Sequence, residues 1–193
     1  VYELRKGDTN IDYLSFVPDG EPTLDINLGK NIELIRPLDI KIAVITNGSL
    51  LYLQDVREDL QRADLVSLKV DAVSRKTWLR TNRPHNSLDL KAILDGMLEF
   101  GALFKGEIIT ETMLIKGMND RYEEIKRIAD FLVLLKPVKS YISIPTRPTA
   151  VKGILPASDQ ILNMSYQVFK EHLANVEYLT GYEGNEFEIG RAV

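Results

Sequence analysis

The sequence predicts an α/β fold built on parallel strands, and two observations support this. Short apolar segments typical of buried strands alternate from end to end with amphipathic segments of helical spacing. Each predicted strand also runs into a group of polar residues, as in parallel α/β folds where a strand enters the next helix. Periodicity by itself leaves open a doubly wound sheet, a barrel or part of a barrel.

Six segments have the composition of strands. The first begins at Tyr13 and stops at a turn of Pro18-Asp19-Gly20, and the second stops at Asn47-Gly48. The remaining four are four to nine residues long, and the third strand is apolar but interrupted by Ser67, Lys69 and Asp71. The expected strands are 13–17, 40–46, 65–73, 107–115, 138–144 and 176–179.

Amphipathic segments separate these strands. Asn119-Asp120 is expected to cap one helix, and Ser158 opens the most regular one. Residues 74–87 form a polar stretch in which no helix is expected. Helical spacing is found at 27–38, 50–63, 88–103, 119–135 and 158–173.

Composition bounds the class of protein. The 193 residues are 45% hydrophobic and 27% charged, and no shift in composition or repeat divides them, so one domain spanning 1–193 is expected. A formal net charge of -4 gives no global attraction to nucleic acid. The chain has no cysteine and therefore offers no disulfide, cysteine nucleophile or iron–sulfur ligand.

Targeting signals are missing from the sequence. No apolar run approaches the ~18 residues of a membrane span, and the N-terminus has no signal-peptide core. We therefore expect a cytoplasmic protein with no membrane partner. Both ends suggest a piece cut from a longer chain, since the first predicted strand follows closely on a start without methionine.

The polar residues at the strand ends are the candidates for function. Ser67, Lys69 and Asp71 are spaced by two, which places them on one side of a strand, as a structural ion pair or as the lining of a pocket. Glu21 is either a turn residue or a fixed carboxylate that accepts hydrogen bonds from a ligand ammonium.

In combination, these motifs resemble the core of the radical S-adenosylmethionine (radical SAM) enzymes. The resemblance covers nearly the whole chain and points toward iron–sulfur oxidoreductases related to the tRNA wybutosine-type radical synthase. It implies a partial (β/α) barrel of parallel strands with outer helices, without its first strand. The matching motifs, in order, are Gly20-Glu21-Pro22-Thr23-Leu24, Thr46-Asn47-Gly48, Ser-x-Lys-x-Asp, Asn82-Arg83-Pro84-His85, Lys116-Gly117-Met118-Asn119-Asp120 and Thr146-Arg147-Pro148.

The resemblance assigns the first two motifs to the methionyl part of S-adenosylmethionine (SAM). Gly20, Glu21 and Pro22 match the Gly-Gly-Glu-type loop that accepts hydrogen bonds from the methionyl ammonium. Asp19 replaces the usual first glycine of that loop. Thr46 and Asn47 match the second-strand loop beside the same part of SAM.

Later motifs are assigned to the rest of SAM. Ser67, Lys69 and Asp71 match the strand that faces the ribose and the carboxylate. Glu111, with Thr110 before it, lies on the strand that borders the adenosine, and the backbone at Pro145 flanks the adenine. Arg147 is a candidate for contact with the substrate.

The family's Cys-x-x-x-Cys-x-x-Cys loop has no counterpart here, so no metal ligand is assigned to this chain. The resemblance implies a radical SAM oxidoreductase or transferase whose [4Fe–4S] cluster is held by an N-terminal loop outside these residues. Such an enzyme cleaves SAM to a 5′-deoxyadenosyl radical, with electrons from a reductant protein such as flavodoxin or ferredoxin. By itself the chain is expected to be inactive. A tRNA substrate fits the relatives but gains no support from the acidic charge balance.

Two other functions remain open. A Schiff-base aldolase or lyase on a β/α barrel would use Lys69 as its nucleophile, with Glu111 or Asp71 moving protons. That alternative leaves Gly-Glu-Pro-Thr unexplained. A non-catalytic binding module with a degenerate site would keep only the fold.

Overall fold

Six strands form one sheet in the order β1-β2-β3-β4-β5-β6. The computed structural model describes residues 11–17, 20–146, 151 and 153–179. The pairs β1–β2, β2–β3 and β5–β6 are parallel, which confirms the predicted α/β class with a parallel sheet. The strands are β1 (Tyr13–Phe16), β2 (Lys41–Thr46), β3 (Leu65–Lys69), β4 (Glu107–Met113), β5 (Lys139–Ser143) and β6 (Val176–Leu179).

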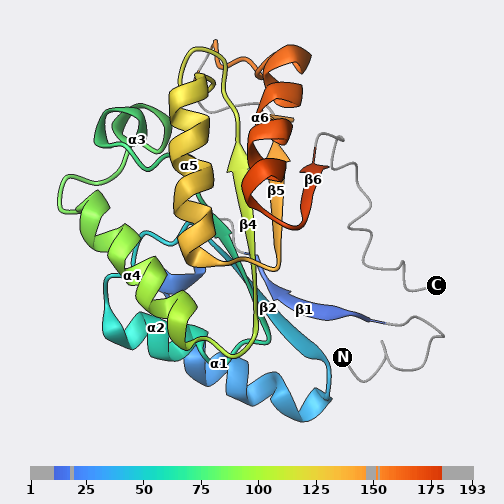
Figure 1. Ribbon diagram of the computed structural model, residues 1–193. Helices are drawn as coiled ribbons and strands as arrows, with labels where there is room; N and C mark the ends of the chain where they lie inside the picture. Colours follow the sequence, from blue (N-terminus) through green and yellow to red (C-terminus); the bar gives the residue numbers. More distant parts are fainter. Residues whose placement is uncertain (1–10, 18–19, 147–150, 152, 180–193) are drawn as a thin grey trace, which may run out of the picture. The chain divides into compact units, whose positions relative to one another are not determined.

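Helices alternate with these strands along the chain, as Figure 1 shows by its colours. Four of the expected helical segments are found with shifts of a few residues at their ends, and a shorter helix lies within 50–63. The helix α3 was not expected. The helices are α1 (Leu28–Ile35), α2 (Gln54–Leu60), α3 (Arg75–Thr81), α4 (Leu90–Leu103), α5 (Tyr122–Leu135) and α6 (Asp159–His172), with short 3-10 turns η2 (Pro22–Leu24) and η3 (Arg36–Leu38).

The chain divides into two compact units. The first comprises Val1–Lys69, Asn86–Thr110 and Leu135–Val138. Its core is formed by apolar side chains of β2 and β3 together with those of α1, α2 and α4, because each of these elements is apolar on one face. Fully buried members of this core are Ile32, Ile42, Val44, Leu60, Val66, Leu68 and Phe100.

The second unit comprises Val70–His85, Glu111–Leu134 and Lys139–Val193. Helix α5 buries the stripe that its sequence predicts, at Ile125, Ile128, Ala129 and Leu132. Helix α6 buries Val168 and Phe169 in the same unit. Among the described residues, no helix has the length and apolar character needed to cross a bilayer.

The third strand is shorter than the sequence suggests, since β3 ends at Lys69 instead of continuing to residue 73. Beyond it, the Val70 amide donates to the Glu111 carbonyl at 2.9 Å within the second unit. The apolar composition continues through Val70 and Ala72 because both side chains are buried, although the regular strand has ended.

Candidate functional site

The first candidate cluster is built around Glu21 in the loop that leads from β1. Glu21 is the N-cap of η2, and its Oε1 accepts hydrogen bonds from the amide of Thr23 at 3.1 Å and the hydroxyl of Thr23 at 2.8 Å. Pro22 takes the first position of the turn, where its fixed φ suits a helical start and its missing N–H costs nothing. The Glu-Pro-Thr sequence therefore folds into a rigid, self-capped turn.

The same carboxylate reaches the loop that follows β2. Its Oε1 accepts from the Thr46 hydroxyl at 2.5 Å, and its Oε2 accepts from the Asn47 amide at 2.8 Å. The Thr46 hydroxyl in turn accepts the Gly48 amide at 3.0 Å, so its proton is directed toward Glu21. Two strand-end motifs separated by 25 residues are thus held together through one side chain.

This Glu21 cluster suits a primary ammonium. A carboxylate offers about four lone-pair positions. Three of the donors converge on Oε1 of Glu21 and one reaches Oε2, which leaves Oε2 able to accept another hydrogen bond. Apart from its neighbours in the chain, none of the residues that the structure describes has an atom within 4 Å of where a side chain on Gly20 would begin.

The Ser-x-Lys-x-Asp motif does not form one strand face. Ser67 is buried within β3 and pairs with Ile45 of β2 in register, and the half-exposed Lys69 is the last residue of β3. Asp71 lies two residues past the strand end, in the second unit. The prediction that all three share a strand face is therefore wrong for Asp71, because the strand stops before it.

Asp71 makes structural contacts in the second unit. Its Oδ1 accepts the Met113 amide at 2.8 Å, and its Oδ2 lies 3.4 Å from Nδ2 of Asn82. The side chain is buried, with 7% exposed. Its carboxylate thus joins the chain after β3 to the end of β4.

A second residue that fixes this region is Asn119, whose role the sequence did not reveal. Instead of capping α5, which begins at Tyr122, it is fully buried. Its Oδ1 accepts the Ile115 amide at 2.8 Å, while its Nδ2 donates to the carbonyls of Asp71 at 2.9 Å and Met113 at 2.8 Å. An asparagine before an amphipathic segment usually indicates a helix N-cap. Only the fold shows that the Asn119 side chain instead binds backbone groups at or beyond the ends of β3 and β4.

The remaining predicted residues lie within β4 and after β5. Glu111 accepts a hydrogen bond from the Ser143 hydroxyl at 2.7 Å and is half-buried. Thr110 is fully buried in the first unit. Pro145 follows β5 and is half-exposed, and Arg147 lies outside the described residues.

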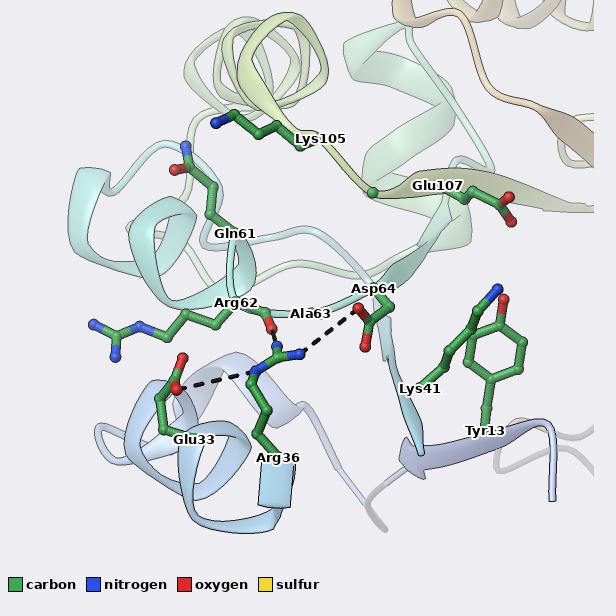
Figure 2. Close-up of a pocket in the computed structure, with 11 residues that line it drawn as sticks. Tyr13, Glu33, Arg36, Lys41, Gln61, Arg62, Ala63, Asp64, Lys105 and Glu107 are labelled. Carbon is green, nitrogen blue, oxygen red and sulfur yellow. Dashed lines mark hydrogen bonds and ion pairs between the residues drawn. The ribbon is translucent and has the colours of Figure 1, made fainter. Parts of the chain in front are cut away.

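The first unit also has a hollow of about 550 Å³ at the amino ends of its strands (Figure 2). Tyr13, Lys41 and Glu107, each the first residue of its strand, line it together with Asp64, which directly precedes β3. In parallel α/β folds, the chemistry collects at the opposite, carboxyl ends. The charged residues that open β2 and β4, Lys41 and Glu107, and Asp64 just before β3 were the sequence signal for this hollow.

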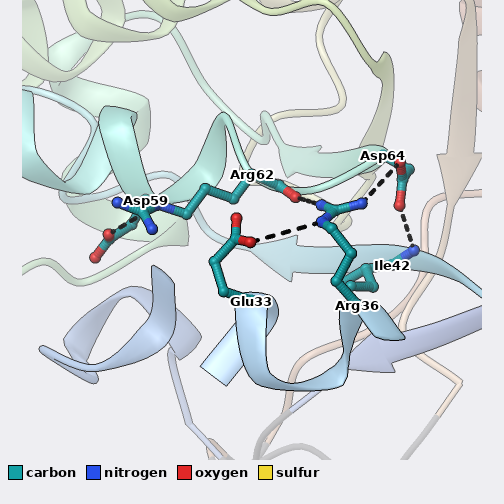
Figure 3. Close-up of polar contacts among 6 residues, drawn as sticks. All are labelled: Glu33, Arg36, Ile42, Asp59, Arg62 and Asp64. Atoms are coloured by element: carbon teal, nitrogen blue, oxygen red, sulfur yellow. Dashed lines mark hydrogen bonds and ion pairs between the residues drawn. The ribbon is translucent and has the colours of Figure 1, made fainter. Parts of the chain in front are cut away.

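The contacts in this hollow indicate a structural role (Figure 3). The Arg36 guanidinium donates to the Arg62 carbonyl and lies 3.7 Å from Asp64 and 4.0 Å from Glu33. Asp64 also accepts the Ile42 amide at 2.7 Å, which ties the start of β2 to the start of β3. The charged side chains of this hollow therefore hold helices and strands of the first unit together.

Among the residues that the structure describes, no three His, Asp or Glu side chains come close enough together to hold a metal ion. The sequence has no cysteine. The residues present therefore do not fit an iron–sulfur cluster, whereas the Glu21 cluster fits an amino-acid ammonium.

Comparison with known proteins gives a consistent result. The model of the Radical SAM superfamily matches residues 2–132. UPF0026 protein MJ1312 of Methanocaldococcus jannaschii is 47% identical over 190 residues, covering 96% of this chain and 59% of that protein. A UPF0026 protein of Helicobacter pylori is 35% identical over 159 residues, 81% of this chain and 51% of that protein. The chain thus spans between half and three-fifths of these relatives' lengths.

Solved structures show the same fold at low sequence identity. A domain of pyruvate-formate lyase-activating enzyme from Bacteroides vulgatus has a TM-score of 0.69 at 17% identity, covering 86% of this chain and 97% of that one. A structure of TYW1 with a lysine-pyruvate adduct has a TM-score of 0.64 at 20% identity, covering 82% and 50%. Structures with identities this low give information on the fold alone. Their fold agrees with the predicted partial barrel.

Proposed function

Because this chain belongs to the radical SAM superfamily, we propose that it supplies SAM-binding residues of a radical SAM enzyme. Members of this superfamily use SAM together with a [4Fe–4S] cluster. The chain has no thiolate to offer that cluster, and we propose that its cysteine ligands belong to polypeptide outside the 193 residues. The proposed enzyme is of the oxidoreductase or transferase type, takes electrons from a protein such as flavodoxin or ferredoxin, and acts on a substrate that we leave open.

The Glu21 cluster carries this proposal. Its carboxylate fixes the Gly20–Pro22 turn against Thr46 and Asn47, the two motifs that the resemblance assigns to the methionyl end. A SAM ammonium placed here would donate to Oε2 of Glu21 and to carbonyls of the turn. A carboxylate–ammonium hydrogen bond is charge-assisted, so it is stronger than a bond between neutral groups.

SAM bound together with a cluster held by other polypeptide would supply the radical chemistry of this superfamily. The contribution of this chain is to bind and orient SAM and to exclude water. Glu21 positions the amino-acid end. Roles for Ser67 and Lys69 toward the ribose and carboxylate, and for Asp71, Glu111, Pro145 and Arg147, stay predictions, with Asp71 acting through the backbone it holds.

The test is Glu21→Gln in the full-length protein, after anaerobic reconstitution of the cluster. Glutamine places an NH2 group at one of the two carboxylate oxygens, so either the Asn47 amide or the Thr46 and Thr23 donors lose their acceptor. The charge-assisted bond to the ammonium is lost as well. We expect SAM affinity, measured by equilibrium titration, to fall about tenfold or more, corresponding to about 1.5–3 kcal/mol.

The matched control is Glu171→Gln, an exposed residue of α6 in the second unit, which makes the same charge change at a residue that is not part of the cluster. It should bind SAM like the unchanged protein. Formation of 5′-deoxyadenosine with a chemical reductant is measured in parallel. The proposal fails if the reconstituted protein neither binds SAM nor forms 5′-deoxyadenosine, or if the two glutamine variants bind SAM equally well.

A further inference from the structure

One segment of this acidic protein is strongly basic. Residues 74–85 contain four Arg and Lys residues and no Asp or Glu, although acidic residues outnumber basic ones in the chain by 28 to 24. All four cations are exposed. The segment comprises α3 and the loop after it, and its cations are Arg75, Lys76, Arg80 and Arg83.

Helix α3 separates its basic and packing faces. At 100° per residue, Arg75, Lys76 and Arg80 fall within an arc of about 140°. Thr77 and Trp78 lie on the other side and are buried, with 5% and 7% exposed. The packing of Trp78 therefore fixes the direction in which the cations project.

The loop before α5 adds two further exposed cations, Lys116 and Arg121. Two contacts within the second unit hold this loop and the start of α5 against α3. Arg80 donates to the Gly117 carbonyl at 2.8 Å, and the Ser74 hydroxyl donates to Glu124 at 2.7 Å. Figure 1 shows α3 beside the amino-terminal half of α5. We call these six residues, Arg75, Lys76, Arg80, Arg83, Lys116 and Arg121, the basic patch.

Nearby carboxylates neutralise little of this charge. Glu124 is only 14% exposed and is bound by Ser74 and by Arg127 at 2.8 Å, while Asp120 accepts the Gly117 amide at 2.8 Å. Glu123 is exposed in the first turn of α5. Within the described part of the chain, no ion pair joins a cation of the basic patch to a carboxylate. The patch is therefore a concentrated positive surface, held in place by its backbone.

Its chemistry favours phosphates over carboxylates of a protein partner. Four of its six cations are arginines, whose planar guanidinium donates to phosphate through two parallel hydrogen bonds. Tyr122, next to Arg121, is 49% exposed and offers a ring on which a base can stack. Helix α3 is about 10 Å long, so its cations can reach more than one phosphate of a nucleic-acid backbone.

We propose that the basic patch binds the phosphate backbone of a nucleic acid, without reading its sequence. The inference rests on the charge and geometry of the second unit and is independent of SAM and of the cluster. RNA and DNA share this phosphodiester chemistry, so the experiment must separate them.

The experiment measures fluorescence anisotropy of labelled single-stranded RNA, duplex RNA and duplex DNA with the full chain over a range of salt concentrations. The variant is Arg75→Gln, Lys76→Gln and Lys116→Gln combined, which leaves the Arg80–Gly117 bond in place. We expect about tenfold or greater loss of affinity near 0.1 M salt. The slope of log affinity against log salt should fall by about two to three units, since each phosphate contact contributes about 0.7–0.9.

The control is Lys30→Gln, Lys41→Gln and Lys105→Gln combined, which removes the same charge from exposed positions of the first unit. It should retain nucleic-acid binding, and circular dichroism checks that both variants are folded. Preference for one of the three probes identifies the kind of nucleic acid. Equal weakening by both triple variants, binding to none of the probes, or tighter binding to polyglutamate than to any of them overturns the proposal.

Discussion

At the scale of single residues, the structure uses a few polar side chains to join segments that are far apart in the sequence. Asn119 is the clearest case, because its fully buried side chain accepts one backbone N–H and donates to two backbone carbonyls. These backbone groups belong to the segment after β3 and to the end of β4 and the loop after it. Buried polar groups such as these need a partner, and removing the shared side chain leaves several of them without one.

We expect Asn119→Ala to lower the free energy of unfolding by about 2–3 kcal/mol, since it leaves buried backbone groups unsatisfied. Asn119→Asp should be at least as harmful, because a carboxylate oxygen would face the carbonyls of Asp71 and Met113. Urea denaturation measures both. The exposed Asn86→Ala serves as control and should change stability by less than about 0.5 kcal/mol; equal effects at the two positions would contradict the prediction.

The residues of the candidate site show how far sequence reasoning reaches. The resemblance places Glu21, Thr46 and Asn47 beside the same part of SAM, and the structure joins these three residues through hydrogen bonds. Asp71 was misplaced because period-two spacing holds only while the strand continues, and β3 ends at Lys69. Where a strand ends depends on tertiary hydrogen bonds, such as that between Met113 and Asp71.

At the scale of elements, the strands were predictable and α3 was not. Continuous apolar segments identify buried strands such as β2 directly. The strand β6 also begins and ends where the sequence indicates, although only Val176 of it is buried. Helix α3 is seven residues long and mostly polar, so it has no amphipathic stripe long enough to recognise. Its formation depends on burial of Thr77 and Trp78, which the sequence does not reveal.

Packing between elements makes a prediction at Gly96 of α4. A Cβ there would lie 2.2 Å from the Leu51 carbonyl oxygen and 2.8 Å from the Tyr52 nitrogen, both backbone atoms. Although alanine favours helices by about 1 kcal/mol over glycine, we expect Gly96→Ala to destabilise the protein by about 1–3 kcal/mol. Thermal unfolding measures the change.

The comparison for Gly96→Ala is Ala102→Gly, on an exposed position of the same helix. It should cost about 1 kcal/mol through helix propensity alone. A stabilised Gly96→Ala protein would show that α4 does not approach the loop after β2 as closely as the structure indicates.

At the scale of the whole molecule, averages over the chain conceal local chemistry. The net charge of -4 is compatible with the basic patch because charge is unevenly distributed along the chain, and residues 74–85 carry four Arg and Lys residues and no Asp or Glu. The absence of cysteine likewise describes this chain and leaves open what other polypeptide contributes to the proposed enzyme.

The cysteine count gives a prediction at this scale. The 193-residue chain, treated anaerobically with iron and sulfide, should retain no cluster, because it offers no thiolate. The full-length protein should retain four irons and four acid-labile sulfides under the same conditions. Chemical analysis of iron and sulfide after gel filtration decides this, and a cluster retained by the chain alone would contradict the proposal that its ligands lie elsewhere.

The Glu21 carboxylate also determines how the two loops can move. Since Glu21, the N-cap of η2, accepts hydrogen bonds from Thr46 and Asn47, this turn and the loop after β2 cannot separate without breaking those bonds. The two loops therefore behave as one cooperative opening unit. Any ligand that binds one loop also reduces local opening of the other, even where it makes no contact with it.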